Sequence, residues 1–159
     1  MAQNFHIINN PMDVVQADEV SDVAIASGHQ TIAIANGRKS QAVAIGTNSL
    51  AIAIADNSVA TASNPYTMAF GGVHPWAEVR GVIGSFLILT ECDSDQKVTN
   101  IVAVKVDGTF IKPNVRYKLL AGYIVPADIS KRDEYPTIKA ETIMRPLTND
   151  EMKKEGIIQ

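Results

Sequence analysis

Few residues of this 159-residue chain have the types and the spacing that catalysis or ligand binding requires. Cys92 is the single cysteine, and no acid or base stands near it in a pattern that would activate a thiol. Asp93 and Asp95 could bind a cation, but two carboxylates between strand-like runs are typical of a solvated hairpin tip. His74 precedes a proline, which favours a turn. We therefore predict no catalytic, metal-binding or cofactor-binding residue, and we expect a protein that is not an enzyme.

Basic side chains alternate along one later stretch, where they could form a stripe for an anionic ligand. These residues are Lys105, Lys112, Arg116 and Lys118. Solvated strand faces show the same alternation, so the stripe identifies no ligand. The formal net charge of the chain is -3, which does not favour partners such as nucleic acid or anionic lipid. No apolar run approaches the roughly 20 residues that span a membrane.

The elements that must position any site are defined by a nine-residue repeat between residues 23 and 76. Each block has alanine at its second position, and most blocks end in serine or threonine after a polar turn. The alanines are Ala24, Ala33, Ala42, Ala51, Ala60 and Ala69, and the hydroxyl residues are Thr31, Ser40, Ser49, Ser58 and Thr67. A fixed period of this kind indicates stacked repeats.

Each block predicts a short strand and a turn. Alanine favours helices, but Gly28, Gly37 and Gly46 recur in the turns and would interrupt a helix in every repeat. Between the turns, apolar residues alternate with a period of two, as strands do. Two blocks would make one turn of a flattened β-roll with parallel strands on two faces, and six blocks would make about three turns.

The alternation also predicts which side chains face inward. Branched residues such as Ile34 and Ile52 occupy the first and third positions of the blocks. Because facing sheets lie about 10 Å apart, we expect the branched residues to fill the core and the alanines to face outward. A flat outer wall of alanine suits close packing against another copy better than it suits solvent. The predicted oligomer interface is Ala24, Ala33, Ala42, Ala51 and Ala60.

Two other solenoid types fit the repeat less well. Calcium-binding rolls need Gly-Gly-x-Gly-x-Asp turns, whereas Asp56 is the one aspartate in the turns of this repeat. Ice-binding solenoids present flat arrays of threonine, but the hydroxyl residues here stand singly at turn corners. We expect these hydroxyls to satisfy backbone groups within the turns.

The chain divides into four predicted parts, and its predicted fold class is all-β. Trp76 ends the repeat, and we expect its ring to plug the open end of the roll. Strand-like runs with turn residues between them then predict a small antiparallel sheet. The parts are an N-terminal arm (1–22), the nonapeptide β-roll (23–76), an antiparallel β domain (77–125) and an extended C-terminal tail (126–159).

The tail is polar, with one short helix predicted over "TNDEMKKEG". Its apolar side chains are spread too widely to make a core of their own. Ordering such a segment costs on the order of 1 kcal/mol per residue in backbone entropy. We therefore predict that it docks on another subunit or another protein, with the anchors Ile138, Ile143, Leu147 and Ile157.

Two motifs follow the repeat, "GVIGSFLILTE" and "VKVDGTFIKPNVRYKL". With the nonapeptides, they resemble a family of uncharacterised proteins from phages and from prophage-like regions of gut Bacteroidota. That family carries "AKGALGCWLVLTEW"-like and "VKVDGxxIKPDTxYxL"-like motifs. The matching positions are Gly81, Gly84, Leu87–Leu89, Glu91, Val104–Gly108, Ile111–Pro113 and Tyr117–Leu119, while Ser85 and Phe86 replace the usual Cys-Trp. The resemblance covers residues 23–125 and implies a viral setting without catalytic residues.

The repeat is also similar to the β-roll heads of trimeric autotransporter adhesins, which pack three rolls side by side. The N-terminal stretch lacks a basic region followed by an apolar run, so we expect no secretory signal and a protein made in the host cytoplasm. The predicted function is a virion structural protein: a homotrimeric decoration, fibre or tail component that acts as a spacer and docks on other virion proteins. The alternative is a binding module, either a receptor or glycan adhesin or a phage protein that sequesters a host small molecule.

Overall fold

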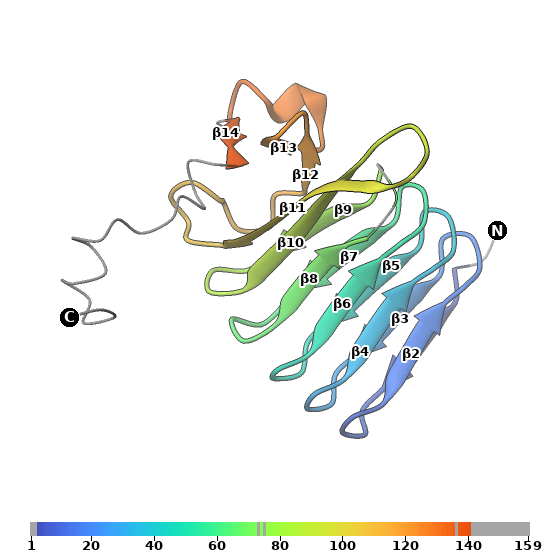
Figure 1. The fold of residues 1–159 in the computed structure, drawn as a ribbon. Helices are drawn as coiled ribbons and strands as arrows, with labels where there is room; N and C mark the ends of the chain where they lie inside the picture. Colours follow the sequence, from blue (N-terminus) through green and yellow to red (C-terminus); the bar gives the residue numbers. More distant parts are fainter. Residues whose placement is uncertain (1–2, 73, 75, 136, 141–159) are drawn as a thin grey trace, which may run out of the picture.

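The computed structural model describes residues 3–72, 74, 76–135 and 137–140. These residues form an almost entirely β protein, in which a flattened parallel solenoid of about five turns leads into antiparallel strands (Figure 1). The predicted fold class is confirmed. The solenoid is longer than the roughly three turns expected from six repeats, because further strands precede and follow the repeat.

The solenoid is built from four-residue strands, and the first eight of them begin nine residues apart. They are β1 (Phe5–Ile8), β2 (Val14–Ala17), β3 (Val23–Ala26), β4 (Ile32–Ala35), β5 (Gln41–Ala44), β6 (Leu50–Ala53), β7 (Val59–Ala62), β8 (Met68–Gly71) and β9 (Glu78–Gly81). Odd-numbered strands lie parallel in one sheet and even-numbered strands in the other. A residue therefore pairs with the residue 18 positions later, as Val14 pairs with Ile32.

The prediction of a separate N-terminal arm is wrong, because β1 and β2 form the first turn of the solenoid. The nine-residue spacing continues upstream of residue 23, although the alanines do not. At the inward positions, His6, Ile8 and Val15 stand where later turns have alanine. An end turn has a neighbour on one side only, so larger side chains are needed to close the core there.

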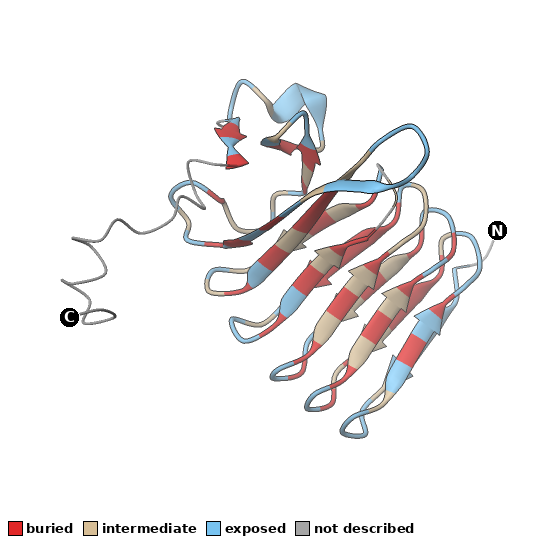
Figure 2. Ribbon diagram, viewed as in Figure 1, coloured by how far each residue is buried: buried red, intermediate tan, exposed pale blue. Residues whose placement is uncertain are grey.

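The predicted direction of the side chains is also wrong. Ala24, Ala33, Ala42, Ala51 and Ala60 are all 0% exposed and form the inner core, together with the alanines two residues further along each strand. The branched residues alternate with these buried alanines and therefore point outward. Most of them are half-buried, which gives several strands alternate tan and red bands in Figure 2.

The physical reason for this reversal is the separation of the two sheets. Consecutive strands, which lie on opposite sheets, bring Cα atoms within 8 Å of each other. This is closer than the roughly 10 Å of ordinary stacked sheets, so methyl groups suffice to fill the gap. The alanines therefore cannot be an oligomer interface. Any flat apolar outer surface must consist of the branched residues instead.

The hydroxyl residues at the turn corners behave as predicted. Thr31, Ser58 and Thr67 are 0% exposed, and each hydroxyl donates a hydrogen bond to the carbonyl oxygen three residues earlier, at 2.8, 2.6 and 2.6 Å. Ser40 and Ser85 make the same bond. The hydroxyls thus provide hydrogen-bond donors for carbonyl groups of the turns, as buried backbone groups require.

Antiparallel strands cap the far end of both sheets. They are β10 (Phe86–Cys92), β11 (Val98–Lys105), β12 (Tyr117–Leu120), β13 (Tyr123–Pro126) and β14 (Ile138–Lys139). β10 pairs in parallel with β8 and antiparallel with β11, while β12 pairs with β9 and is followed by β13 and β14. The predicted boundary at residue 76 is therefore wrong, because both solenoid sheets continue directly into the cap.

The cap closes the core with large side chains. Leu87, Tyr117 and Ile124 are all 0% exposed where the solenoid has alanine-sized residues. Trp76 does not plug the roll, contrary to the prediction. Its side chain is 54% exposed, and the Lys118 amine lies 4.7 Å from the centre of its ring. The exposed indole therefore holds a neighbouring cation instead of filling the core.

Part of the predicted docking tail packs on its own chain. Residues 129–131 form a short 3₁₀ turn, and Ile138 in β14 pairs with Ile124 in β13. Ile138 is 7% exposed and belongs to the core, so its predicted role as an anchor for another protein is wrong. Ile143, Leu147, Ile157 and the helix predicted over "TNDEMKKEG" lie outside the described residues.

The carboxylate of Asp107 organises the loop between β11 and β12. Its Oδ1 atom accepts hydrogen bonds from the backbone N–H groups of Thr109, Phe110 and Ile111, at 2.8, 2.9 and 3.0 Å. Burial acts to raise the pKa of Asp107, but these hydrogen bonds outweigh it, and the pKa of Asp107 lies below its ordinary value.

We expect acid to weaken this loop. A carboxyl group whose pKa is lower in the folded state contributes stability that is complete above the ordinary Asp pKa of about 3.9 and is lost as pH falls through the folded-state pKa. Asp107→Asn keeps an acceptor oxygen but removes the titration. The thermal midpoint of this variant should fall less steeply than that of the unmodified protein between about pH 5 and pH 2. Asp95→Asn, at an exposed site, is the control, and equal slopes for all three proteins would contradict the prediction.

Candidate interaction face and ligand groove

The outer surface of the six-stranded sheet carries two straight rows of side chains. Backbone pairing places equivalent residues of β2, β4, β6, β8 and β10 next to one another. The first row is Val14, Ile32, Leu50, Met68 and Phe86, and the second is Gln16, Ile34, Ile52, Phe70 and Ile88. Nine of these ten side chains are apolar and none is charged.

Seven of these residues form a continuous surface, which we call the apolar face: Val14, Ile32, Ile34, Leu50, Ile52, Phe70 and Ile88. Val14 is 52% exposed and the others are half-buried, because each side chain is shielded by its neighbours in the row. A contiguous, flat apolar surface of this kind is typical of an interface with another protein. The flat outer wall expected from the sequence therefore exists, but it is made of branched and aromatic residues.

The outer surface of the opposite sheet is chemically different. Gln41, Thr61, Glu78 and Arg80 interrupt the apolar residues there. Arg80 Nε donates to Thr61 Oγ1 at 2.9 Å, and Arg116 Nη1 lies 3.4 Å from Glu78 Oε2. Burial and the nearby charge of Arg116 lower the pKa of Arg80. The two outer surfaces are therefore not interchangeable, and the uncharged one is the candidate for association.

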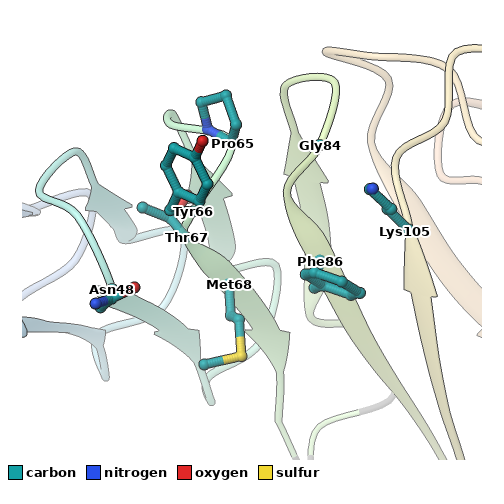
Figure 3. Close-up of a pocket in the computed structure, with 8 residues that line it drawn as sticks. All are labelled: Asn48, Pro65, Tyr66, Thr67, Met68, Gly84, Phe86 and Lys105. Carbon is teal, nitrogen blue, oxygen red and sulfur yellow. The ribbon is translucent and has the colours of Figure 1, made fainter.

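A groove of about 530 Å³ lies where the first row meets a column of turns. It is lined by Asn48, Pro65, Tyr66, Thr67, Met68, Gly84, Phe86 and Lys105. Backbone pairing aligns Met68, Phe86 and Lys105 across β8, β10 and β11. Figure 3 shows Tyr66 and Lys105 on opposite sides of Phe86, with Gly84 on the loop between them.

The predicted basic stripe does not form. Lys105 lines the groove, whereas the Lys112 amine donates to the Gly108 carbonyl oxygen at 2.9 Å. Arg116 pairs with Glu78, and Lys118 lies over Trp76. Each of these side chains points to a different partner, so an anionic ligand could not contact them together.

The acidic loop and the cysteine also lack a ligand site. Asp93 Oδ1 accepts from the backbone N–H groups of Asp95 and Lys97, both at 2.9 Å, which confirms the predicted hairpin tip. Burial, with the negative charges of Asp93 and Glu91, raises the pKa of the Cys92 thiol. Within the described ranges, no three His, Cys, Asp or Glu side chains gather as a metal site would require, and no helix is long and apolar enough to cross a membrane.

Glu91 joins the two sheets within the cap, and sequence reasoning did not find this contact. Its two carboxylate oxygens accept hydrogen bonds from the backbone N–H groups of Ala121 and Gly122, in the turn between β12 and β13. The Gly122 distance is 3.1 Å. Both turn residues have positive φ, at 51° and 76°, so their N–H groups point the same way and suit one anion.

Comparison of the chain with protein-family models, with curated proteins and with solved structures finds no match in any of the three. The function must therefore be argued from the apolar face and the groove themselves.

Proposed function

We propose that the protein is a phage virion structural protein, in which a rigid β-roll spacer associates side by side with two further copies of itself. The observation that carries the proposal is the apolar face. A roll paired in register along its whole length keeps a fixed shape, as a spacer requires. The viral setting is supported by the resemblance of residues 23–125 to phage and prophage proteins.

A second copy of the same chain is the partner that best matches the apolar face. The face has no charge to select an oppositely charged partner, and its side chains repeat with the spacing of the strands. Apolar character throughout is typical of permanent interfaces between identical subunits. In a closed ring of three, each copy meets its two neighbours through two different patches, so the first row of one copy would pack against the second row of the next.

The docking role is proposed for residues 141–159 alone. Residues 123–126 and 138–139 pair with each other in the protein's own sheet, which removes them as anchors for another protein. The proposal therefore places attachment to other virion proteins at the C-terminal end, and self-association along the roll.

Light scattering tests the assembly. The unmodified protein should have three times the chain mass of 17.1 kDa. The double variant Ile34→Lys/Ile52→Lys places two charges on the apolar face and should be a folded monomer, because desolvating unpaired charges opposes association. Val43→Lys is the matched control: Val43 is also half-buried and outward-facing, but it lies on the opposite sheet.

An unmodified protein that is monomeric at micromolar concentration would contradict the proposed assembly. A trimer that survives the double variant would show that a different surface makes the contacts. The viral setting is tested separately, by mass spectrometry of purified phage particles, and absence of the chain from them would contradict a virion role.

A further inference from the structure

The groove lies where the regular stacking of the solenoid is interrupted. One column of turns contains equivalent residues that are 18 positions apart: Met12, Gln30, Asn48 and Tyr66. The backbone N–H group of each of the first three donates to a carbonyl oxygen of the next turn in the column. The next position in this column is Gly84, in a shorter turn with φ +90°. The Tyr66 ring, which lines the groove beside this turn, is 70% exposed.

The absent side chain of Gly84 lets this turn pack closely against Pro65. A Cβ atom there would lie 3.0 Å from the Pro65 Cβ atom, so even alanine would narrow the groove. Met68 and Phe86, which are 40% and 46% exposed, form its floor. Two aromatic rings and a thioether thus stand in contact with water around one concave surface, which costs solvation free energy unless a ligand covers them.

The polar groups of the groove are not used within the chain. Among the described residues, neither the Asn48 side-chain amide nor the Lys105 amine makes a hydrogen bond or an ion pair within the protein. The neighbouring turns on this side of the roll, residues 27–31, 45–49 and 63–67, carry no acidic side chain. No ion pair joins the Lys105 amine to a carboxylate among the described residues, so the amine is available to a ligand.

We propose that this groove binds an acidic saccharide, a sugar unit that carries a carboxylate. The electron-rich faces of Tyr66 and Phe86 suit the weakly positive C–H face of a sugar ring. Lys105 pairs with the carboxylate, and the Asn48 amide can both donate to and accept from ring hydroxyls. The volume of about 530 Å³ lies within the usual range for small-molecule sites.

The lining residues favour a carboxylate over a phosphate. Phosphate groups are usually held by several backbone N–H groups at a helix N-terminus, or by arginine forks. The groove is lined by strands and turns and contains one cation, Lys105, which matches the single charge of a sugar acid. This activity goes beyond the proposed structural role and does not rest on it, because the groove lies at the end of the first row, outside the apolar face.

NMR spectra of the protein, recorded while each probe is added, test the proposal. The probes are oligosaccharides that contain glucuronic, galacturonic or sialic acid, the neutral glucose analogue of the first, and uridine monophosphate. We expect at least one acidic saccharide to bind. Lys105→Met should weaken that binding about fivefold, as an exposed ion pair would. Tyr66→Ala should weaken it about tenfold, as loss of an aromatic contact would.

Matched variants separate the groove from general effects. Lys97→Met removes an exposed lysine and Tyr123→Ala removes an exposed tyrosine, both outside the groove, and neither should change the affinity. The Ile34→Lys/Ile52→Lys variant should bind the saccharide as the unmodified protein does, whatever its oligomeric state. Four results would each overturn the proposal. They are that none of the three acidic saccharides binds, that the neutral analogue binds as tightly as the acidic saccharide, that the nucleotide binds more tightly than any of them, or that Tyr66→Ala binds the saccharide as tightly as the unmodified protein does.

Discussion

Replacing Ala42 with aspartate is expected to unfold the roll, whereas the same change at Val43, one residue further along β5, is expected to leave it folded. Ala42 is 0% exposed between the two sheets, where a carboxylate would have neither water nor a counter-ion. An uncompensated buried charge costs about 3–5 kcal/mol, a large part of the 5–15 kcal/mol that stabilises a typical domain. The Val43 side chain is half-buried on the outer surface, where a carboxylate can reach water.

Circular dichroism and urea titration of the two variants measure this difference. The comparison is sharp because the residues are neighbours on one strand and receive the same new side chain. If Val43→Asp unfolds and Ala42→Asp does not, the branched residues form the core after all, and the assignment of the apolar face fails with it.

A single methyl group at Gly46 is expected to have the second largest effect. A Cβ atom there would overlap the Gly28 carbonyl oxygen and lie 2.8 Å from the Ser27 carbonyl oxygen. Both contacts are with the backbone of the preceding turn, which cannot move without breaking the pairing between β3 and β5. We expect Gly46→Ala to destabilise the protein by about 3 kcal/mol, and to lower its thermal midpoint by roughly 10 °C.

Ile45→Ala is the control for this prediction. Ile45 precedes Gly46 in the same turn and is 44% exposed, so the change should cost less than about 1 kcal/mol. A Gly46→Ala midpoint equal to that of Ile45→Ala would contradict the close packing of successive turns.

The sequence predicts the solenoid well but not the direction of its side chains. The nine-residue period and the turn residues determine strand positions, because strands this short must stack to be stable. The expected sheet separation of about 10 Å then assigned the inside wrongly. A better indicator was present: polar residues occur at the outward positions, as Gln41 and Thr61, whereas the inward positions of β3 to β8 carry alanine or glycine.

The groove could not be found from the sequence, because its parts lie far apart along the chain. The pairing of β8, β10 and β11 places Tyr66 and Lys105 on opposite sides of Phe86, and the antiparallel register of β10 and β11 depends on the cap. The Pro65–Tyr66 pair, where comparable turns carry His29–Gln30 and Thr47–Asn48, was the one local indication. The close approach of Gly84 to Pro65 became apparent only with the neighbouring turn in place.

The pairing of residues 18 positions apart also determines how the length of this protein can change. A gain or loss of 18 residues adds or removes one whole turn and keeps every later strand in its own sheet. It moves the cap along the roll by about 4.8 Å, the distance between neighbouring strands. A change of nine residues would place each later strand, the cap included, in the opposite sheet, and would divide the apolar face between the two sheets. The reach of the molecule can therefore be adjusted without dividing the apolar face only in steps of one turn.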